Sequence, residues 1–90
     1  MRLACELAIE HERDLHVLHL STTDELAELR QARQEAADRD LDIALTAEVC
    51  PHHLFLNTGI YEELGTRARV NPPIRSEENR KAVWEALRSD

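Results

Sequence analysis

Residues 14–25, DLHVLHLSTTDE, contain the clearest signal of the fold. Residues 14–20 form a short apolar run, which is typical of a buried strand. The residues after it predict the start of a helix, because Thr22 and Glu25 have the spacing of a capping box, in which side chains satisfy backbone amides of the first turn. A buried strand followed at once by a helix is the repeating unit of parallel α/β folds.

The same alternation continues on both sides of this stretch. Apolar residues at helical spacing predict helices over residues 1–12, 23–38 and 77–88, the last of them capped by Ser76. A second apolar run predicts a strand over residues 41–48, parallel to the first. Residues 49–65 contain a proline and two glycines, so most of this segment is expected to be a loop.

The predicted elements are consecutive βα units of a larger α/β fold. Two parallel strands by themselves leave both sheet edges unpaired and both faces short of cover. Phenylalanine, tyrosine and tryptophan occur once each in 90 residues, which is few for the core of a free-standing small domain. No internal repeat or linker divides the chain, so residues 1–90 are expected to form part of one domain.

Composition excludes several classes of partner. The formal net charge is −7, with 18 acidic against 11 basic residues, which argues against nucleic acid and against an anionic membrane surface. No apolar run approaches the roughly 20 residues of a spanning helix, and no secretory signal is visible. Cys5 and Cys50 stand far apart and are expected to be reduced thiols in a cytoplasmic protein.

Two groups of histidines are candidates for metal chemistry. His19 falls at the C-terminal end of the first strand, and imidazole is the commonest metal ligand in proteins. Because strand side chains alternate, His19 is expected to face the interior with Val17 while His16 faces the helices. The alternative for His19 is a hydrogen bond to a backbone carbonyl. His52 and His53 follow the second strand, where a loop permits both to reach a metal; otherwise one packs and the other is solvated.

Two other features near these histidines carry weaker signals. Cys50 has no base fixed beside it, so we expect a buried thiol rather than a nucleophile. Residues 69–75, RVNPPIR, are stiffened by two prolines. An amide and two guanidinium groups on such a loop could grip a carboxylate, or the segment is an ordinary connection with solvated arginines.

Taken together, three motifs resemble dihydroorotase in order and spacing. They are HVLHLST at residues 16–22, TAEVCPHHLFL at residues 46–56 and VNPPIRS at residues 70–76. The first motif is shared with hydantoinases and allantoinases. An allantoinase usually has tyrosine where His53 stands and lacks the asparagine found here at Asn71, so the second and third motifs favour dihydroorotase.

The resemblance implies a fold, a reaction and two site residues. The fold is a (β/α)8 TIM-type barrel, of which this chain would supply about two consecutive βα units plus a loop and flanking helices. The reaction is the interconversion of N-carbamoyl-L-aspartate and dihydroorotate in pyrimidine biosynthesis, at a metal centre that is usually zinc. The resemblance implies that His19 binds metal and that Asn71 binds substrate. It leaves the role of His52 and His53 open, either beside the metal ligands, where they would orient them, or at the mouth of the site.

The same resemblance implies that the isolated chain is inactive. The family's His-x-His, its carboxylate ligand and its downstream aspartate are not among these residues, and a catalytic zinc needs about three protein ligands. Two alternatives to a dihydroorotase segment remain. One is another cyclic amidohydrolase, a hydantoinase or allantoinase. The other is a non-catalytic dihydroorotase-like subunit that partners aspartate transcarbamoylase.

Overall fold

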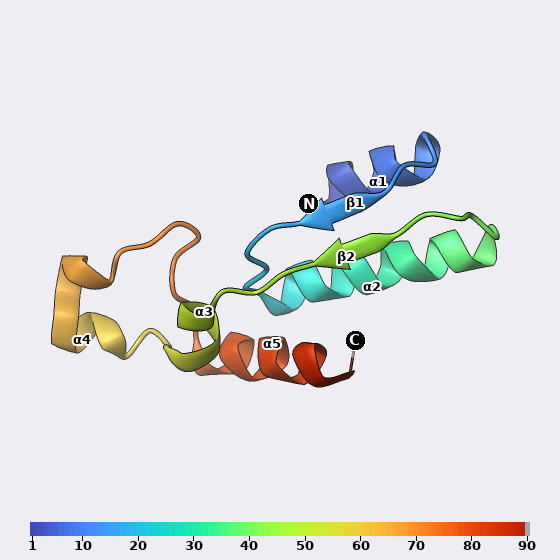
Figure 1. The fold of residues 1–90 in the computed structure, drawn as a ribbon. Helices are drawn as coiled ribbons and strands as arrows, with labels where there is room; N and C mark the ends of the chain where they lie inside the picture. The colour runs from blue at the N-terminus through green and yellow to red at the C-terminus, as the bar shows by residue number, and fades with distance from the viewer. Residues whose placement is uncertain (90) are drawn as a thin grey trace.

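The chain forms two short parallel strands, three longer helices and a run of short helical turns. The computed structural model describes residues 1–89. The elements are α1 (Arg2–Glu10), β1 (Leu15–Val17), α2 (Thr23–Asp38), β2 (Leu45–Ala47), α3 (Pro51–Phe55), α4 (Ile60–Leu64), the 3₁₀ turn η1 (Gly65–Ala68) and α5 (Glu77–Ser89). The predicted helices and strands are therefore all present, in the predicted order (Figure 1).

The two strands pair in parallel, as predicted, with Leu15 opposite Leu45 and Val17 opposite Ala47. Each strand has three residues, which is shorter than expected. Regular pairing on β1 ends because His19 has a φ of 39°, in the left-handed region. The two segments that follow the strands still stay together beyond this bend, since Leu20 N donates to Glu48 O at 2.9 Å.

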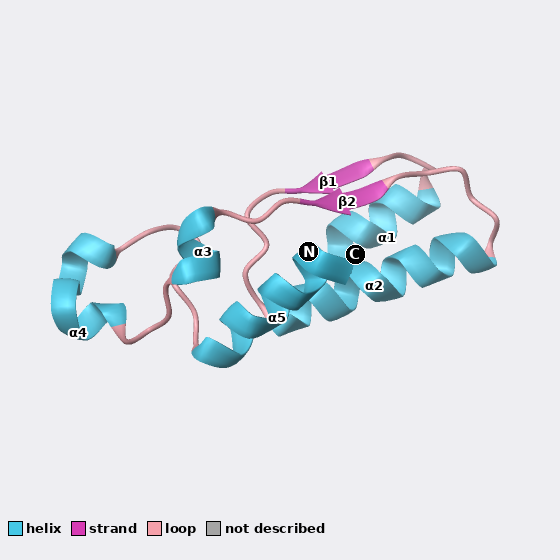
Figure 2. Ribbon diagram, turned by 60° about the horizontal axis from the view of Figure 1, so that its bottom comes forward, coloured by secondary structure: helices cyan, strands magenta, loops and turns pink. Residues whose placement is uncertain are grey.

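Helices cover one face of the strand pair and leave the other open. Figure 2 shows β1 and β2 as one layer with α1 and α2 beneath it. The buried residues of α2 recur three or four positions apart, which gives the helix one apolar face; they are Leu26, Leu29, Ala32 and Ala36. Leu45 of β2 is buried in the same cluster, whereas its neighbour Thr46 is exposed.

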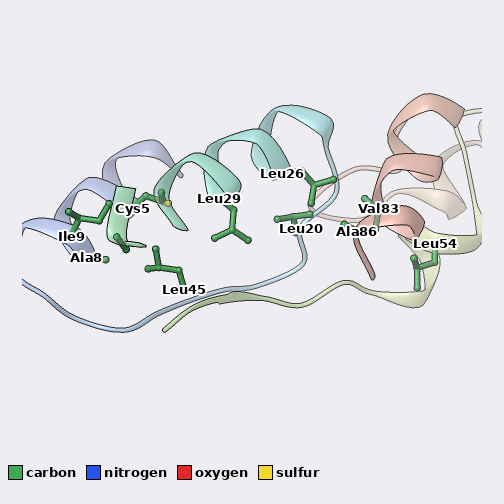
Figure 3. Packing of buried hydrophobic residues seen from close by; sticks show 12 residues of the cluster. Cys5, Ala8, Ile9, Leu20, Leu26, Leu29, Leu45, Leu54, Val83 and Ala86 are labelled. Atoms are coloured by element: carbon green, nitrogen blue, oxygen red, sulfur yellow. The ribbon is translucent and has the colours of Figure 1, made fainter. Parts of the chain in front are cut away.

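The C-terminal helix α5 closes the other end of the core. Val83 is fully buried and Leu20 is 1% exposed. Figure 3 shows that they lie near Leu26 of α2 and Ala86 of α5. The backbone amide of Thr23 donates to Asn79 Oδ1 at 2.8 Å, which ties the start of α2 to α5. The cluster therefore joins elements that lie some 60 residues apart in the sequence.

The predicted capping box at the start of α2 is confirmed, with one difference. Glu25 N donates to Thr22 Oγ1 at 3.2 Å, as the motif predicts. The Glu25 carboxylate accepts from Ser21 N at 3.2 Å rather than from the amide of Thr22. Ser21 is buried, so this carboxylate satisfies an amide that would otherwise have no access to water.

The expectation that residues 49–65 are mostly loop is wrong. Most of this segment lies in α3, α4 and the start of η1. Pro51 occupies the first turn of α3, where its fixed φ and missing amide favour a helix start. Five-residue helices are too short for the 3.6-residue period to be visible in a sequence, and their stability comes from docking. Trp84 Nε1 and Arg80 Nη1 both donate to Leu54 O, at 2.6 and 3.1 Å, and dock α3 onto α5.

Two further expectations concern the state of the two cysteines and the presence of a helix that could cross a membrane. Both cysteines are free, Cys5 buried in α1 and Cys50 partly exposed, so the expectation that Cys50 is buried is wrong. Within residues 1–89, no helix has the length and apolar character needed to cross a bilayer.

Candidate functional site

His19 lies in the bend that follows β1. Its φ of 39° takes the backbone out of the extended conformation, and its side chain is exposed. The bend sits at the C-terminal end of the strand pair, the end at which parallel α/β folds carry their sites. The predicted position of His19 relative to the strand is therefore observed.

The expected orientation of His16 is wrong. His16 does not face the helices; it lies exposed on the open face of the strand pair. Its Nδ1 is hydrogen-bonded to Thr46 Oγ1 at 2.8 Å, and its Nε2 lies 3.7 Å from Glu48 Oε2. The prediction assumed that side chains alternate between the two faces without a break from His16 to His19. The bend at His19 breaks this two-residue period, so the faces of the strand follow from His16 and Val17 and not from His19.

Glu48 and Thr46 are polar residues that were not predicted as site residues. Both lie on the open face beside His16, at or just beyond the end of β2. The signal was present in the sequence, because Thr46 and Glu48 alternate with Leu45 and Ala47, which is typical of a strand with one covered face. This row brings a carboxylate to the same end of the strands as His19.

The second histidine pair lies at the start of α3 together with a cysteine. One ligand atom from each of Cys50, His52 and His53 lies within 4.8 Å of the others. The rings of His52 and His53 have centroids 4.2 Å apart and are tilted by 52°. Pro51 in the first turn of the helix fixes this arrangement, because it holds the backbone between the cysteine and the two histidines.

His53 connects this turn to the proline-rich segment. Its side chain is 3% exposed, and its Nε2 lies 3.0 Å from Pro72 O. A carbonyl oxygen can only accept, so Nε2 carries a proton, and Nδ1 of the neutral ring presents a lone pair. Within residues 1–89, no hydrogen-bond partner reaches that buried Nδ1. A buried acceptor left unpaired is costly.

His52 is influenced both by its neighbour His53 and by His19, which follows the other strand. Burial of the ring lowers the pKa of His52, and nearby His53 and then His19 lower it further by charge repulsion. Its imidazole is therefore held in the neutral form, which is the form that binds metal. The influence of His19 on His52 means that the residue after β1 and the turn after β2 are electrostatic neighbours.

Asn71 lies on the segment between η1 and α5. Figure 1 shows this segment beyond the arrowheads of both strands, at their C-terminal end. The side chain of Asn71 is exposed and lines a cavity with Tyr61, Arg69 and Val70. His19 does not line that cavity. The two predicted site residues therefore share one end of the molecule but not one described cavity.

The arginines of the proline-rich segment have different environments. Arg75 Nε donates to Ser21 Oγ at 3.3 Å, which holds the segment against the chain that follows β1. Ile74 N donates to Tyr61 Oη at 3.1 Å, which holds it against α4. Arg69 is exposed beside Asn71. Of the two guanidinium groups, Arg69 is the one placed to meet an anionic ligand.

Known proteins resemble this chain in sequence and in fold. No protein-family profile matches it. Allantoinases of Salmonella paratyphi B and Salmonella newport are 45% identical to it over 73 residues, which are 81% of this chain and 15% of theirs. The solved structure of a D-hydantoinase from Bacillus sp. AR9 matches 96% of this chain and 18% of its own, with a TM-score of 0.82 and 25% identity.

These relatives narrow the expectation drawn from the motifs. The chain spans less than a fifth of their length. The D-hydantoinase is a TIM-barrel amidohydrolase, so the small α/β structure is consistent with part of such a barrel. Allantoinase and hydantoinase were the alternatives to dihydroorotase, and they fit these similarities better than dihydroorotase does. The chain is therefore a homologue of the cyclic amidohydrolases allantoinase and D-hydantoinase, in the amidohydrolase superfamily.

Proposed function

We propose that this chain is a segment of a metal-dependent cyclic amidohydrolase of the allantoinase or hydantoinase type, which opens a cyclic amide by hydrolysis. The observation that carries the proposal is the 45% identity to allantoinase over 73 residues. The placement of His19, His52 and Asn71 at the C-terminal end of two parallel strands supports it, because that is where barrel enzymes build their sites.

In this proposal His19 holds the catalytic metal, for which zinc is the leading choice. Nitrogen ligands suit zinc, and His19 is exposed at the strand end, where no hydrogen bond from residues 1–89 competes for its ring. When bound, the metal supplies Lewis acidity and a more acidic water. Asn71 and Arg69 orient the polar groups of the substrate. The other metal ligands belong to the part of the relatives that this chain does not span.

Dihydroorotase is the second candidate, and one contact favours it. His53 and the Asn71–Pro72–Pro73 run are the residues on which the dihydroorotase resemblance depends, and His53 Nε2 lies 3.0 Å from Pro72 O. The two sequence features on which the dihydroorotase resemblance depends are therefore in contact. A non-catalytic subunit that partners aspartate transcarbamoylase is the remaining alternative. A protein of that class would hydrolyse none of allantoin, hydantoin and dihydroorotate.

A chimaera tests the proposal. The matched segment of Salmonella allantoinase is replaced by the corresponding residues of this chain, and hydrolysis of allantoin, hydantoin and dihydroorotate is measured with zinc. We expect turnover of allantoin or hydantoin. His19→Gln should abolish turnover and lower the bound metal, whereas the control His16→Gln should retain the metal. Turnover of dihydroorotate alone would favour the second candidate, and turnover in His19→Gln would contradict the role of His19.

The isolated 90-residue chain is expected to be inactive toward all three substrates. A catalytic zinc needs about three protein ligands in addition to its water, and His19 is the single strand-end residue assigned to that centre. The measurement is the same set of assays on the chain alone with added zinc. Turnover above a zinc-only blank that is lost in His19→Gln would overturn this expectation.

A further inference from the structure

Beyond the proposed catalytic centre, we propose that Cys50, His52 and His53 form a separate binding site for a thiophilic divalent ion such as zinc. The three side chains already gather at one turn, with a ligand atom of each within 4.8 Å of the others. A thiolate and two imidazoles are a donor set that zinc prefers. The site belongs to the turn after β2 and does not include His19.

The strongest support is the state of His53. Its buried Nδ1 has no hydrogen-bond partner within residues 1–89, although the side chain is only 3% exposed. Its Nε2 is committed to the carbonyl of Pro72. A histidine that donates one ring N–H to a backbone carbonyl and presents the other nitrogen as a lone pair has the arrangement of a metal ligand, because the carbonyl fixes the tautomer and ring orientation.

The other two side chains have the exposure that binding needs. Cys50 and His52 are both partly exposed, so an ion can enter and both side chains can rotate toward it. Zinc holds sulfur at about 2.3 Å and nitrogen at about 2.0–2.1 Å, which requires a modest approach of the three atoms. Binding replaces the thiol proton of Cys50, which passes to solvent, by a sulfur–metal bond.

The site would also have a structural effect. His53 lies at the start of α3 and its ring contacts Pro72, so the ion would sit where α3 meets the proline-rich segment. An ion that fixes His53 therefore also fixes residues 69–75 relative to the strand end. Metal occupancy of this turn would order the segment that carries Asn71, independently of hydrolysis.

Cobalt(II) titration of the reduced 90-residue chain tests the proposal. We expect a near-ultraviolet thiolate-to-cobalt band and tetrahedral visible bands that saturate at one ion per chain, and we expect zinc to displace them. Loss of an outer-sphere partner alone weakens metal affinity roughly 10–100-fold, so Cys50→Ser and His53→Ala should each weaken it by at least about 100-fold.

The controls separate this site from other thiols and from the catalytic centre. Cys5→Ser removes the other cysteine, which is buried in α1, and should leave the thiolate band unchanged. His19→Gln should also leave it unchanged. Because His53 is buried, His52→Ala serves as a second ligand variant if His53→Ala unfolds the chain. A spectrum unaltered by Cys50→Ser, or affinity lost equally in His19→Gln, would overturn the proposal of a separate site.

Discussion

Two regions of the molecule are held together by different forces. The βα body, comprising α1, β1, α2, β2 and α5, contains nearly all of the buried apolar cluster. The connection, residues 49–76, contributes Leu54 to that cluster, with Val49 packed against it, and buries Ala68 and Ile74 elsewhere. Polar contacts such as the one from Ile74 N to Tyr61 Oη also hold it. The molecule is elongated, 48 by 22 by 16 Å, and Figure 1 shows the connection extending from one end of the body.

The two regions therefore differ in role, because one stabilises the fold and the other holds candidate site residues. The body supplies the free energy of folding, because burial of apolar side chains is the largest favourable contribution. The connection holds Cys50, His52, His53 and Asn71, whose polar groups need partners rather than a dense core. Substitutions in the body should therefore unfold the chain, whereas substitutions in the connection should alter one contact at a time.

The largest expected effect is in the body. Leu20 is 1% exposed, and Leu20→Ala should lower the free energy of unfolding by about 3 kcal/mol, since it removes buried methyl groups and leaves a cavity. Leu18→Ala is the matched control, because Leu18 is 55% exposed two residues away. Urea unfolding followed by circular dichroism measures both. Equal losses in the two variants would show that the body is not held by its core.

A smaller effect is expected where the connection docks on the body. Trp84→Phe keeps one aromatic ring but removes the five-membered ring with its hydrogen bond from Nε1 to Leu54 O, and should cost at least about 1 kcal/mol. Hydrogen exchange should quicken in α3 and remain unchanged in α2, because Leu54 O is on the connection. Uniform quickening throughout the chain would mean that the two regions unfold as one unit.

The smallest effect is a pH dependence at the junction of the two regions. Hydrogen bonds from Arg80 and then Asn57 lower the pKa of Glu77 to about 2 from 4.5. A depressed pKa means that Glu77 contributes stability above pH 4.5 and loses it as the pH falls toward 2. The contribution is modest, because the side chain is 40% exposed and solvent screens it.

Glu77→Gln should flatten the pH dependence of unfolding between these two pH values, and exposed Glu78→Gln is the control. Unfolding measured across the acid range checks both variants. Asn57 lies on the connection, so Asn57→Ala should reproduce part of the Glu77→Gln effect. If Glu77→Gln left the pH dependence of unfolding unchanged, this contact would not help to join the two regions.

The elements of the body and its parallel pairing could be predicted from the sequence alone. Apolar spacing located α2 and α5, and the Thr22–Glu25 pair located the start of α2, because these signals act within a few residues. The three motifs also carried the relationship to cyclic amidohydrolases, although allantoinase and hydantoinase match better than the expected dihydroorotase.

The arrangement of the site depends on contacts between segments that are distant in the sequence. The bend at His19 ended β1 early and left His16 facing the open side, where Thr46 meets it from 30 residues away. The contact between His53 and Pro72 spans 19 residues and, among residues 1–89, leaves Nδ1 without a hydrogen-bond partner. Local propensity contains no information about such contacts, because they form only when separate segments are packed against a common core.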